Sequence, residues 1–297
     1  MHSPSSPFST RFSGIWIPIV TPFAPDGSVD SAGLGALVRT LLAAGVHGIV
    51  VGGTTGEPAV LDDAERALVL RTVRDAAGAL PLVMGVAGIA PRDVIAGARR
   101  WQGEVQGLLI PPPSYVRPSQ QGIIDFYAAV SAATESPLIV YDIPSRTGVS
   151  LSLETMRSLS RLPRILAVKD CGGDAHKTQS LIADGRLQVL AGDDHNIFTS
   201  LCQGGSGAIA ATAHLHPERF VAMYDALQRG DLATARALHH ALAPLVHAAF
   251  AEPSPGPVKA GLADLGLIGP HLRAPMTPAT PQGAQAMREA YAFAARR

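Results

Sequence analysis

The residue best suited to covalent chemistry is Lys169, which stands near the end of the short apolar run ILAVKD (165–170). Strand alternation places Ile165, Ala167 and Lys169 on one face, and an inner barrel strand would point this face inwards. Burying an ammonium group is costly, so burial should lower the pKa of Lys169 from about 10.4 towards neutrality. We therefore predict a free amine that attacks carbonyl carbons and forms an imine. The alternative is a lysine that reaches solvent or pairs with Asp170.

Polar side chains that could serve such a lysine follow two other apolar runs. Tyr141 shares a face with Ile139 in the preceding run, so its phenol is expected beside the amine, where it could transfer protons. The alternative is a core tyrosine with one hydrogen bond. The turn GTTGE (53–57) offers amides and hydroxyls to a carboxylate, and Arg146 offers a planar fork to another. Such turns are common, and Arg146 could equally be a surface arginine.

A metal centre is not expected. Asp193 and Asp194 are adjacent, but no histidine or third carboxylate lies at ligand spacing, so helix capping is the better interpretation. Cys171 follows the lysine run without a base to activate its thiol and is expected to be a small filler. Cys171 and Cys202 cannot build a disulfide framework, which favours a reducing, cytoplasmic setting.

These residues need a regular framework, and the chain supplies one in eight nearly continuous apolar runs. Each run is short enough for a strand covered on both faces, and each gap has room for a helix. This rhythm favours a (β/α)8 TIM barrel over an open doubly wound sheet, with the reactive groups at the carboxyl ends of the strands. The runs are GIWIPIV (14–20), GIVVGG (48–53), PLVMGV (81–86), GLLIPP (107–112), PLIVYDI (137–143), ILAVKD (165–170), QVLAGDD (188–194) and GAIAAT (207–212).

The gaps between the apolar runs contain sequence signals of helices. The spacing of Asp62 and Glu65 predicts a capping box at a helix start. One apolar stripe at helical spacing consists of Leu34, Leu37, Val38, Leu41 and Leu42.

After the eighth run only helices are expected. We divide the chain into a catalytic barrel, residues 1–229, and a C-terminal helical appendage, residues 230–297. Helices are expected over Pro217–Arg229, which completes the barrel, and then over 231–251, about 257–265 and 281–296. The linking segment 252–257 is too rich in proline to be helical.

Composition excludes several classes of protein. Of 297 residues, 47% are hydrophobic and 16% are charged, so the chain can bury a large core. Twenty-four basic residues balance twenty-four acidic ones and only 5% of residues are aromatic, so nucleic acid is not an expected partner. The longest uncharged stretch, 195–217, is broken by polar residues and glycines, so no membrane span is expected.

In this order and register, the motifs resemble those of the dihydrodipicolinate synthase / N-acetylneuraminate lyase family over nearly the whole chain. Each motif is modest alone, but the set is highly specific. The matching pieces are VTPF (20–23), GGTTGE (52–57), YVRPSQQG (115–122), YDIPSRTG (141–148), VKD (168–170), AGDD (191–194), GGSGAIA (204–210), EPSPGPVKAGLADLG (252–266) and PMTP (275–278).

The resemblance implies a lyase that condenses pyruvate with aspartate-semialdehyde to 4-hydroxy-tetrahydrodipicolinate in lysine biosynthesis. It implies no cofactor beyond the covalent imine between lysine and pyruvate. Proton transfer is assigned to the family's relay positions, and substrate binding to a second set of residues. The catalytic set is Lys169, Tyr141, Thr54 and Tyr115, and the substrate-binding set is Thr55, Gly56, Arg146, Gly192 and Ile209.

Members are typically homotetramers built as dimers of tight dimers, with Tyr115 expected to reach in from a neighbouring subunit. Arg146 favours an aldehyde that bears a carboxylate. A pyruvate-dependent class I aldolase acting on another aldehyde or on a 2-keto-3-deoxy acid is the alternative, and a keto-acid-binding protein without activity is a third. Departures from the family's lysine-inhibitor pocket argue against feedback by lysine; they are Ser114, Pro58, Asp63 and Arg66.

Overall fold

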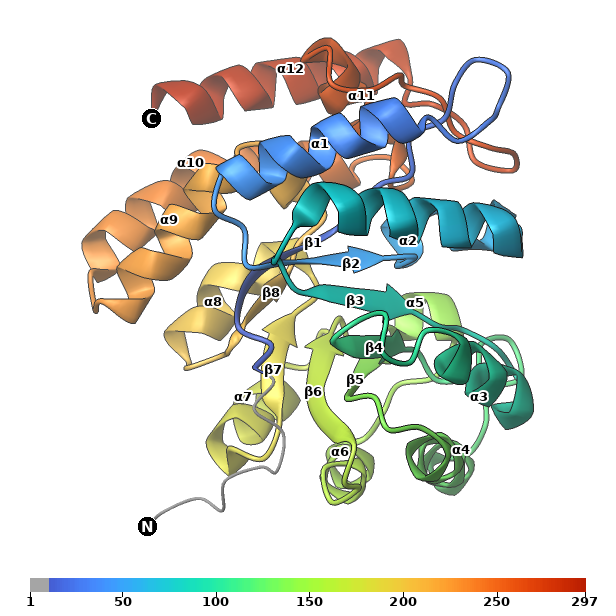
Figure 1. Cartoon of the computed structure of the whole chain (residues 1–297). Coiled ribbons are helices and arrows are strands. Elements are labelled where there is room, and N and C mark those ends of the chain that lie inside the picture. Colours follow the sequence, from blue (N-terminus) through green and yellow to red (C-terminus); the bar gives the residue numbers. More distant parts are fainter. Residues whose placement is uncertain (1–10) are drawn as a thin grey trace.

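The computed structural model describes residues 11–297 and shows the predicted (β/α)8 barrel (Figure 1). Its strands are parallel and follow the chain order, and β1 pairs with β8, so the sheet is closed and the open alternative is wrong. The strands are β1 (Gly14–Pro18), β2 (Gly48–Val51), β3 (Leu82–Gly85), β4 (Gly107–Ile110), β5 (Leu138–Asp142), β6 (Ile165–Asp170), β7 (Gln188–Ala191) and β8 (Gly207–Ile209). Each strand lies inside one predicted run. Several runs extend beyond the end of their strand, and polar residues occur in these extensions.

Helices surround the barrel and continue beyond it (Figure 1). The α-helices are α1 (Ser31–Ala43), α2 (Asp63–Ala77), α3 (Pro91–Arg100), α4 (Gln120–Ala133), α5 (Pro144–Thr147), α6 (Leu153–Leu159), α7 (Ala175–Asp184), α8 (Ile197–Cys202), α9 (Pro217–Gln228), α10 (Leu232–Phe250), α11 (Gly256–Asp264) and α12 (Pro281–Arg296). Short 3-10 turns are η1 (Thr54–Gly56), η2 (Pro58–Val60), η3 (Asp194–Asn196) and η4 (Thr212–His214).

The helix signals are confirmed with one exception. The Asp62 carboxylate accepts from the Glu65 amide at 2.8 Å, and Glu65 accepts from the Asp62 amide at 3.1 Å, which is the predicted capping box of α2. On α1, four residues of the predicted stripe are buried, but Leu42 is 42% exposed. The stripe of five leucine and valine positions is wider than the face that α1 buries.

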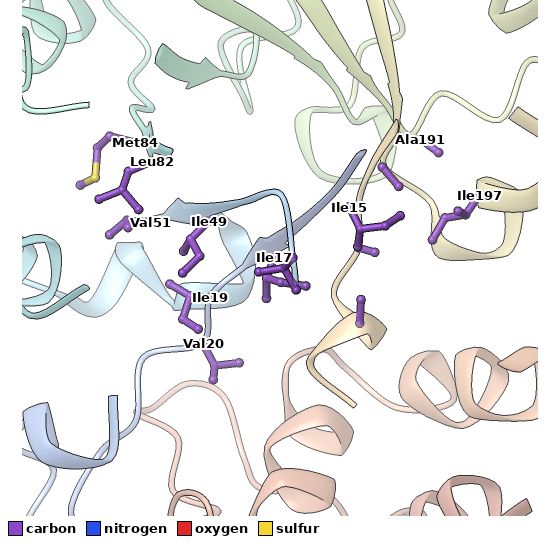
Figure 2. Packing of buried hydrophobic residues seen from close by; sticks show 14 of the residues in the cluster. Ile15, Ile17, Ile19, Val20, Ile49, Val51, Leu82, Met84, Ala191 and Ile197 are labelled. Carbon is purple, nitrogen blue, oxygen red and sulfur yellow. The ribbon is translucent and has the colours of Figure 1, made fainter. Parts of the chain in front are cut away.

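Two apolar layers hold the strands. Alternate residues of each strand point to opposite layers, as the strand period requires. Figure 2 shows part of the outer layer, where Ile17 of β1 lies near Ile49 of β2, Ile15 lies towards Ala191 and Ile197, and the layer continues to Met84 of β3. The barrel interior is a separate cluster of Phe12, Trp16, Val50, Val83, Leu109, Ile139, Tyr141, Ile143, Ala167, Leu190 and Ile209.

Strand β6 departs from simple alternation at its start. The register with β5 shifts there, because Leu138 pairs with Ile165 and Ile139 pairs with Ala167, which leaves Leu166 unpaired. Ile165 therefore belongs to the outer layer and Leu166 contacts the interior, so the predicted inward position of Ile165 is wrong. Alternation resumes at Ala167, and this returns Lys169 to the inner face.

The C-terminal helices occur close to where they were predicted. α10 packs against α9 and α12, and α11 packs against α12. The predicted non-helical segment 252–257 is too long, since α11 begins at Gly256 and carries Pro257 in its first turn, where proline is tolerated. The division at residues 229 and 230 stays a prediction, and residues 1–10 of the predicted barrel domain lie outside the described residues. None of the helices in residues 11–297 is long and apolar enough to cross a membrane.

Candidate active site

Lys169 and Tyr141 lie side by side at the carboxyl ends of β6 and β5. The two residues are direct partners in the strand register, and they are 5% and 6% exposed. The Lys169 ammonium nitrogen is 4.4 Å from the centre of the Tyr141 ring. Thr54 and Lys169 are both within hydrogen-bonding reach of the Tyr141 hydroxyl. The structure thus brings an amine, a phenol and a hydroxyl into one small group.

Lys169 differs from the other lysines of the chain. The sequence contains three lysines, and all three are buried. Lys177 is paired with Asp142 and Lys259 is paired with Glu57, whereas Lys169 has no ion pair within residues 11–297. A buried amine without a fixed counter-ion is the one that remains available for chemistry.

The electrostatics of Lys169 correct the first prediction. Burial alone lowers the pKa of Lys169, but Tyr141, Cys171 and Asp194 outweigh burial, so the pKa lies above its ordinary value. The predicted shift towards neutrality is therefore wrong, because it considered desolvation without the acidic groups around the amine, of which Tyr141 is on β5 and Asp194 follows β7. Burial also raises the pKa of Tyr141, and Lys169 opposes this rise. The resting pair is an ammonium beside a neutral phenol, so the amine must lose a proton before it attacks.

Gly192, directly after β7, lies against the side chain of Lys169. A methyl group at Gly192 would be 2.6 Å from Lys169 Cγ and 2.5 Å from Cys171 Sγ. Only glycine leaves room for the lysine here, and this contact gives the predicted site residue a physical reason. Burial raises the pKa of the Cys171 thiol to about 12, which fits the prediction that it fills space.

The turn after β2 forms η1 and carries three of the predicted site residues. No side chain caps the start of η1, so the first-turn amides of Thr54 and Thr55 have no capping side chain as a hydrogen-bond acceptor. Thr55 is buried, at 8% exposure. Gly56 donates its amide to Gly53 O at 2.8 Å, and its carbonyl accepts from Thr21 Oγ1 at 2.7 Å. Gly56 therefore has no free amide for a carboxylate and supports the turn instead.

A cavity of about 200 Å³ opens beside this group. Arg146, on the short helix α5, lines it and makes no ion pair with any residue of 11–297, so its guanidinium is free to bind an anion. Lys169 is not on the cavity wall but lies next to it, against the ring of Tyr141. The wall consists of Gly52, Gly53, Thr54, Pro58, Gly85, Val86, Ala87, Leu109, Pro111, Ser114, Tyr141, Ile143, Arg146 and Thr147.

Of the nine predicted site residues, only Thr54, Tyr141 and Arg146 line this cavity, and Ile209 and Tyr115 are among the six that do not. Ile209 of β8 is in the barrel interior, at 1% exposure. Tyr115 is 89% exposed and has a backbone φ of 71°, so its ring projects into solvent from the loop after β4. The single chain does not bring Tyr115 into its own site. Its neighbour Ser114 does line the cavity.

Asp193 and Asp194 have different roles. Asp193 caps η3, as predicted, by accepting from the His195 amide at 3.1 Å. Asp194 is buried and accepts instead from the amides of Ala211 and Thr212, at 3.3 and 2.6 Å. Residues 11–297 contain no group of three or more histidine, cysteine, aspartate or glutamate residues that could hold a metal ion.

Sequence reasoning missed several residues of the site. The apolar wall from β3 and β4 carries no chemical signal, and it could be found only from its position at strand ends. Asp194 was interpreted as a cap, although its field acts on Lys169. Three of the residues that depart from the family's lysine-inhibitor pocket contact one another. Arg66 Nη2 donates to Pro58 O at 2.8 Å, and Arg66 Nη1 lies 3.9 Å from Asp63 Oδ1.

Comparison with known proteins places this geometry in a family. The model of the Dihydrodipicolinate synthetase family matches residues 11–292. The 4-hydroxy-tetrahydrodipicolinate synthase of Sorangium cellulosum is 38% identical over 284 residues, which cover 94% of each chain. That of Haloarcula marismortui is 37% identical over 270 residues, which cover 90% of this chain and 88% of the relative.

Solved structures agree. A chloride-inhibited dihydrodipicolinate synthase from Acinetobacter baumannii, complexed with pyruvate, is similar with a TM-score of 0.92 and 32% identity, covering 95% of this chain and 99% of that one. A structure described as the first monomeric dihydrodipicolinate synthase variant also has a TM-score of 0.92, with 30% identity over 96% of this chain and 97% of that one. The chain belongs to the dihydrodipicolinate synthetase family.

Proposed function

We propose that this protein is a 4-hydroxy-tetrahydrodipicolinate synthase, which joins pyruvate to aspartate-semialdehyde through an imine on Lys169. The observation that carries the proposal is the buried Lys169 against Tyr141, beside a cavity that exposes the unpaired guanidinium of Arg146. One end of this arrangement forms a covalent bond to a carbonyl carbon, and the other binds an anionic group.

The pyruvate half of the reaction uses Lys169 and its neighbours. The ammonium first loses a proton, and the amine nitrogen then attacks the ketone carbon. Loss of water from the carbinolamine gives the imine, and loss of a methyl proton gives the enamine. Tyr141 lies at the nitrogen and contacts Thr54, so it is placed to move the protons that these steps require. Thr55 would bind the pyruvate carboxylate, and Gly56 would hold the turn.

The second half forms the carbon–carbon bond. The enamine carbon attacks the aldehyde carbon of aspartate-semialdehyde, whose carboxylate Arg146 would bind. The amino group of the adduct then displaces Lys169 and closes the ring of the product. Gly192 leaves room for the lysine during these steps, and Ile209 would close the base of the site.

Assembly is part of the proposal. The exposed Tyr115 would enter the site of a neighbouring subunit in a tight dimer, and two such dimers would form a homotetramer. The exposure of Val116 (52%) and of Ile89 (50%) in the neighbouring loop supports an interface at this point, because both are apolar. The free cysteines support a reducing compartment, and we propose a cytoplasmic enzyme of lysine biosynthesis that needs no added cofactor.

The test compares aldehydes. The protein is assayed with pyruvate and aspartate-semialdehyde, and in parallel with a simple aldehyde of similar length that lacks the carboxylate. Arg146→Ala should lower kcat/KM for aspartate-semialdehyde roughly 30-fold, since a charge-assisted hydrogen-bonded pair contributes about 2 kcal/mol. The same variant should leave the neutral aldehyde unaffected, and Arg146→Lys should lie between. Equal losses for both aldehydes would reject the role of Arg146, and preference for the neutral aldehyde would favour the aldolase alternative.

A further inference from the structure

The C-terminal helices contact the catalytic turn through one buried ion pair. Lys259 on α11 is fully buried, and its ammonium nitrogen donates to Glu57 Oε1 at 2.5 Å. Glu57 directly follows Thr54, Thr55 and Gly56 of η1, and it is 6% exposed. A residue from the appendage thus holds the end of the turn that carries two of the proposed catalytic and binding hydroxyls.

The surroundings fix both charges in place. The second Glu57 oxygen accepts from the Arg273 amide at 3.3 Å, and Lys259 also donates to His271 O at 2.9 Å. The ring of Phe23 lies under both cations, with Lys259 Nζ at 4.4 Å and Arg273 Cζ at 4.5 Å from its centre. Burial lowers the pKa of Lys259, and Glu57 opposes this change.

The backbone at Glu57 needs such support. Its φ of 53° and ψ of 42° are left-handed, which is uncommon for a residue other than glycine. Such a conformation persists where the surrounding contacts determine it. Buried ion pairs contribute little net stability compared with apolar replacements, so the pair is better explained by the conformation that it fixes.

We infer that Glu57 and Lys259 are positioning residues for the imine-forming reaction, and that the C-terminal helical region therefore acts on catalysis through the turn. This inference rests on the proposed function. The pair touches no substrate. It holds η1 so that Thr54 meets Tyr141 and Thr55 meets the pyruvate carboxylate.

The experiment separates positioning from stability. In the full-length protein, Glu57→Met together with Lys259→Met removes both charges at similar side-chain volume, and Glu57→Gln keeps an oxygen that accepts from Lys259. Glu65→Gln is the matched control, since Arg273 Nη2 lies 2.5 Å from Glu65 Oε1 on α2, so this pair joins the same C-terminal region to α2 through a side chain that does not contact Glu57. For each protein we measure the Tm, the apparent affinity for pyruvate and the rate of borohydride trapping at saturating pyruvate.

The double variant should trap pyruvate at least 10-fold more slowly and bind it more weakly, because misplacement of about 1 Å costs roughly 10²-fold. Its Tm should stay near that of the parent, and Glu57→Gln should recover part of the rate. Glu65→Gln should lower the Tm and leave the trapping rate unchanged. If the double variant fails to fold, the comparison of Glu57→Gln with Glu65→Gln decides.

Two outcomes would overturn the inference, and a third would reject the proposed function. Parental trapping in a folded double variant, or in Glu57→Gln where only that variant folds, would show that the turn does not need the pair. An equal loss of rate in Glu65→Gln would show that general docking of the C-terminal region is responsible. Absence of trapping in the parent protein would instead reject the proposed function itself, so the two failures are distinguishable.

Discussion

A methyl group at Gly192 is the smallest change that tests the arrangement around Lys169. In Gly192→Ala the new carbon would lie 2.5 Å from Cys171 Sγ, 2.6 Å from Lys169 Cγ and 2.9 Å from Lys169 Cε, whereas ordinary contacts begin at 3.4 Å. The lysine must therefore move by about 0.8 Å. Gly192 is not among the residues with positive φ, so the substitution changes crowding without backbone strain.

The size of the effect follows from this displacement. A shift of about 1 Å at a reacting group costs roughly 10²-fold, so we expect imine formation with pyruvate to slow by roughly 30- to 100-fold. Overpacking of the site should cost about 1–3 kcal/mol of stability. The assay is the rate of pyruvate trapping by borohydride under saturating pyruvate, with thermal unfolding measured on the same samples.

Two further variants make the result specific. Gly122→Ala on α4 is the control, because its new carbon would meet only atoms at 3.5 Å and should leave the trapping rate unchanged. Adding Cys171→Ala to Gly192→Ala removes the sulfur contact and should restore part of the rate. The reasoning is refuted if Gly192→Ala traps pyruvate within about twofold of the parent protein.

Three other predictions follow from the same structure. Because the pKa of Lys169 lies above its ordinary value, the rate of pyruvate trapping by borohydride should still rise as the pH increases above neutrality, and a plateau near neutrality would contradict the raised pKa. His214 is buried and accepts from the Val20 amide at 3.1 Å, and burial lowers its pKa to about 4, so the unfolded chain binds the extra proton as the pH falls from about 6.5 to 4. About 3 kcal/mol of the free energy of unfolding should be lost over that pH window. Urea titrations of His214→Gln should not show this loss, and equal pH dependence of stability in both proteins would reject the role of His214. If Tyr115 serves a neighbouring subunit, mixing Tyr115→Phe with Lys169→Ala after subunit exchange should restore activity that neither variant has alone, and no restoration would place Tyr115 outside the shared site.

Strand phase explains why the centre of the site was predictable. Tyr141 and Lys169 occur at the ends of adjacent apolar runs, and parallel strands in register bring such ends together. The period of two was sufficient for these two residues. It failed at Ile165, because the β-bulge that leaves Leu166 unpaired is a property of two strands together and not of one run.

The parts that could not be predicted depend on contacts between distant segments. The pKa of Lys169 depends on Asp194, which lies on another element, so desolvation alone gave the wrong direction. The pair of Glu57 and Lys259 joins positions 202 residues apart, and no local pattern announces it. The position of Tyr115 has a similar origin, since its proposed function requires a second chain.

The central claim is that Lys169 forms the imine, and peptide mapping after borohydride reduction with pyruvate tests it most directly. The chain has three lysines, and the other two are engaged in buried ion pairs, so the assignment is unambiguous. We predict a stable pyruvyl adduct on Lys169 that forms only when pyruvate and reductant are both present. An adduct on Lys177 or Lys259, or an unmodified Lys169 under these conditions, would contradict the mechanism.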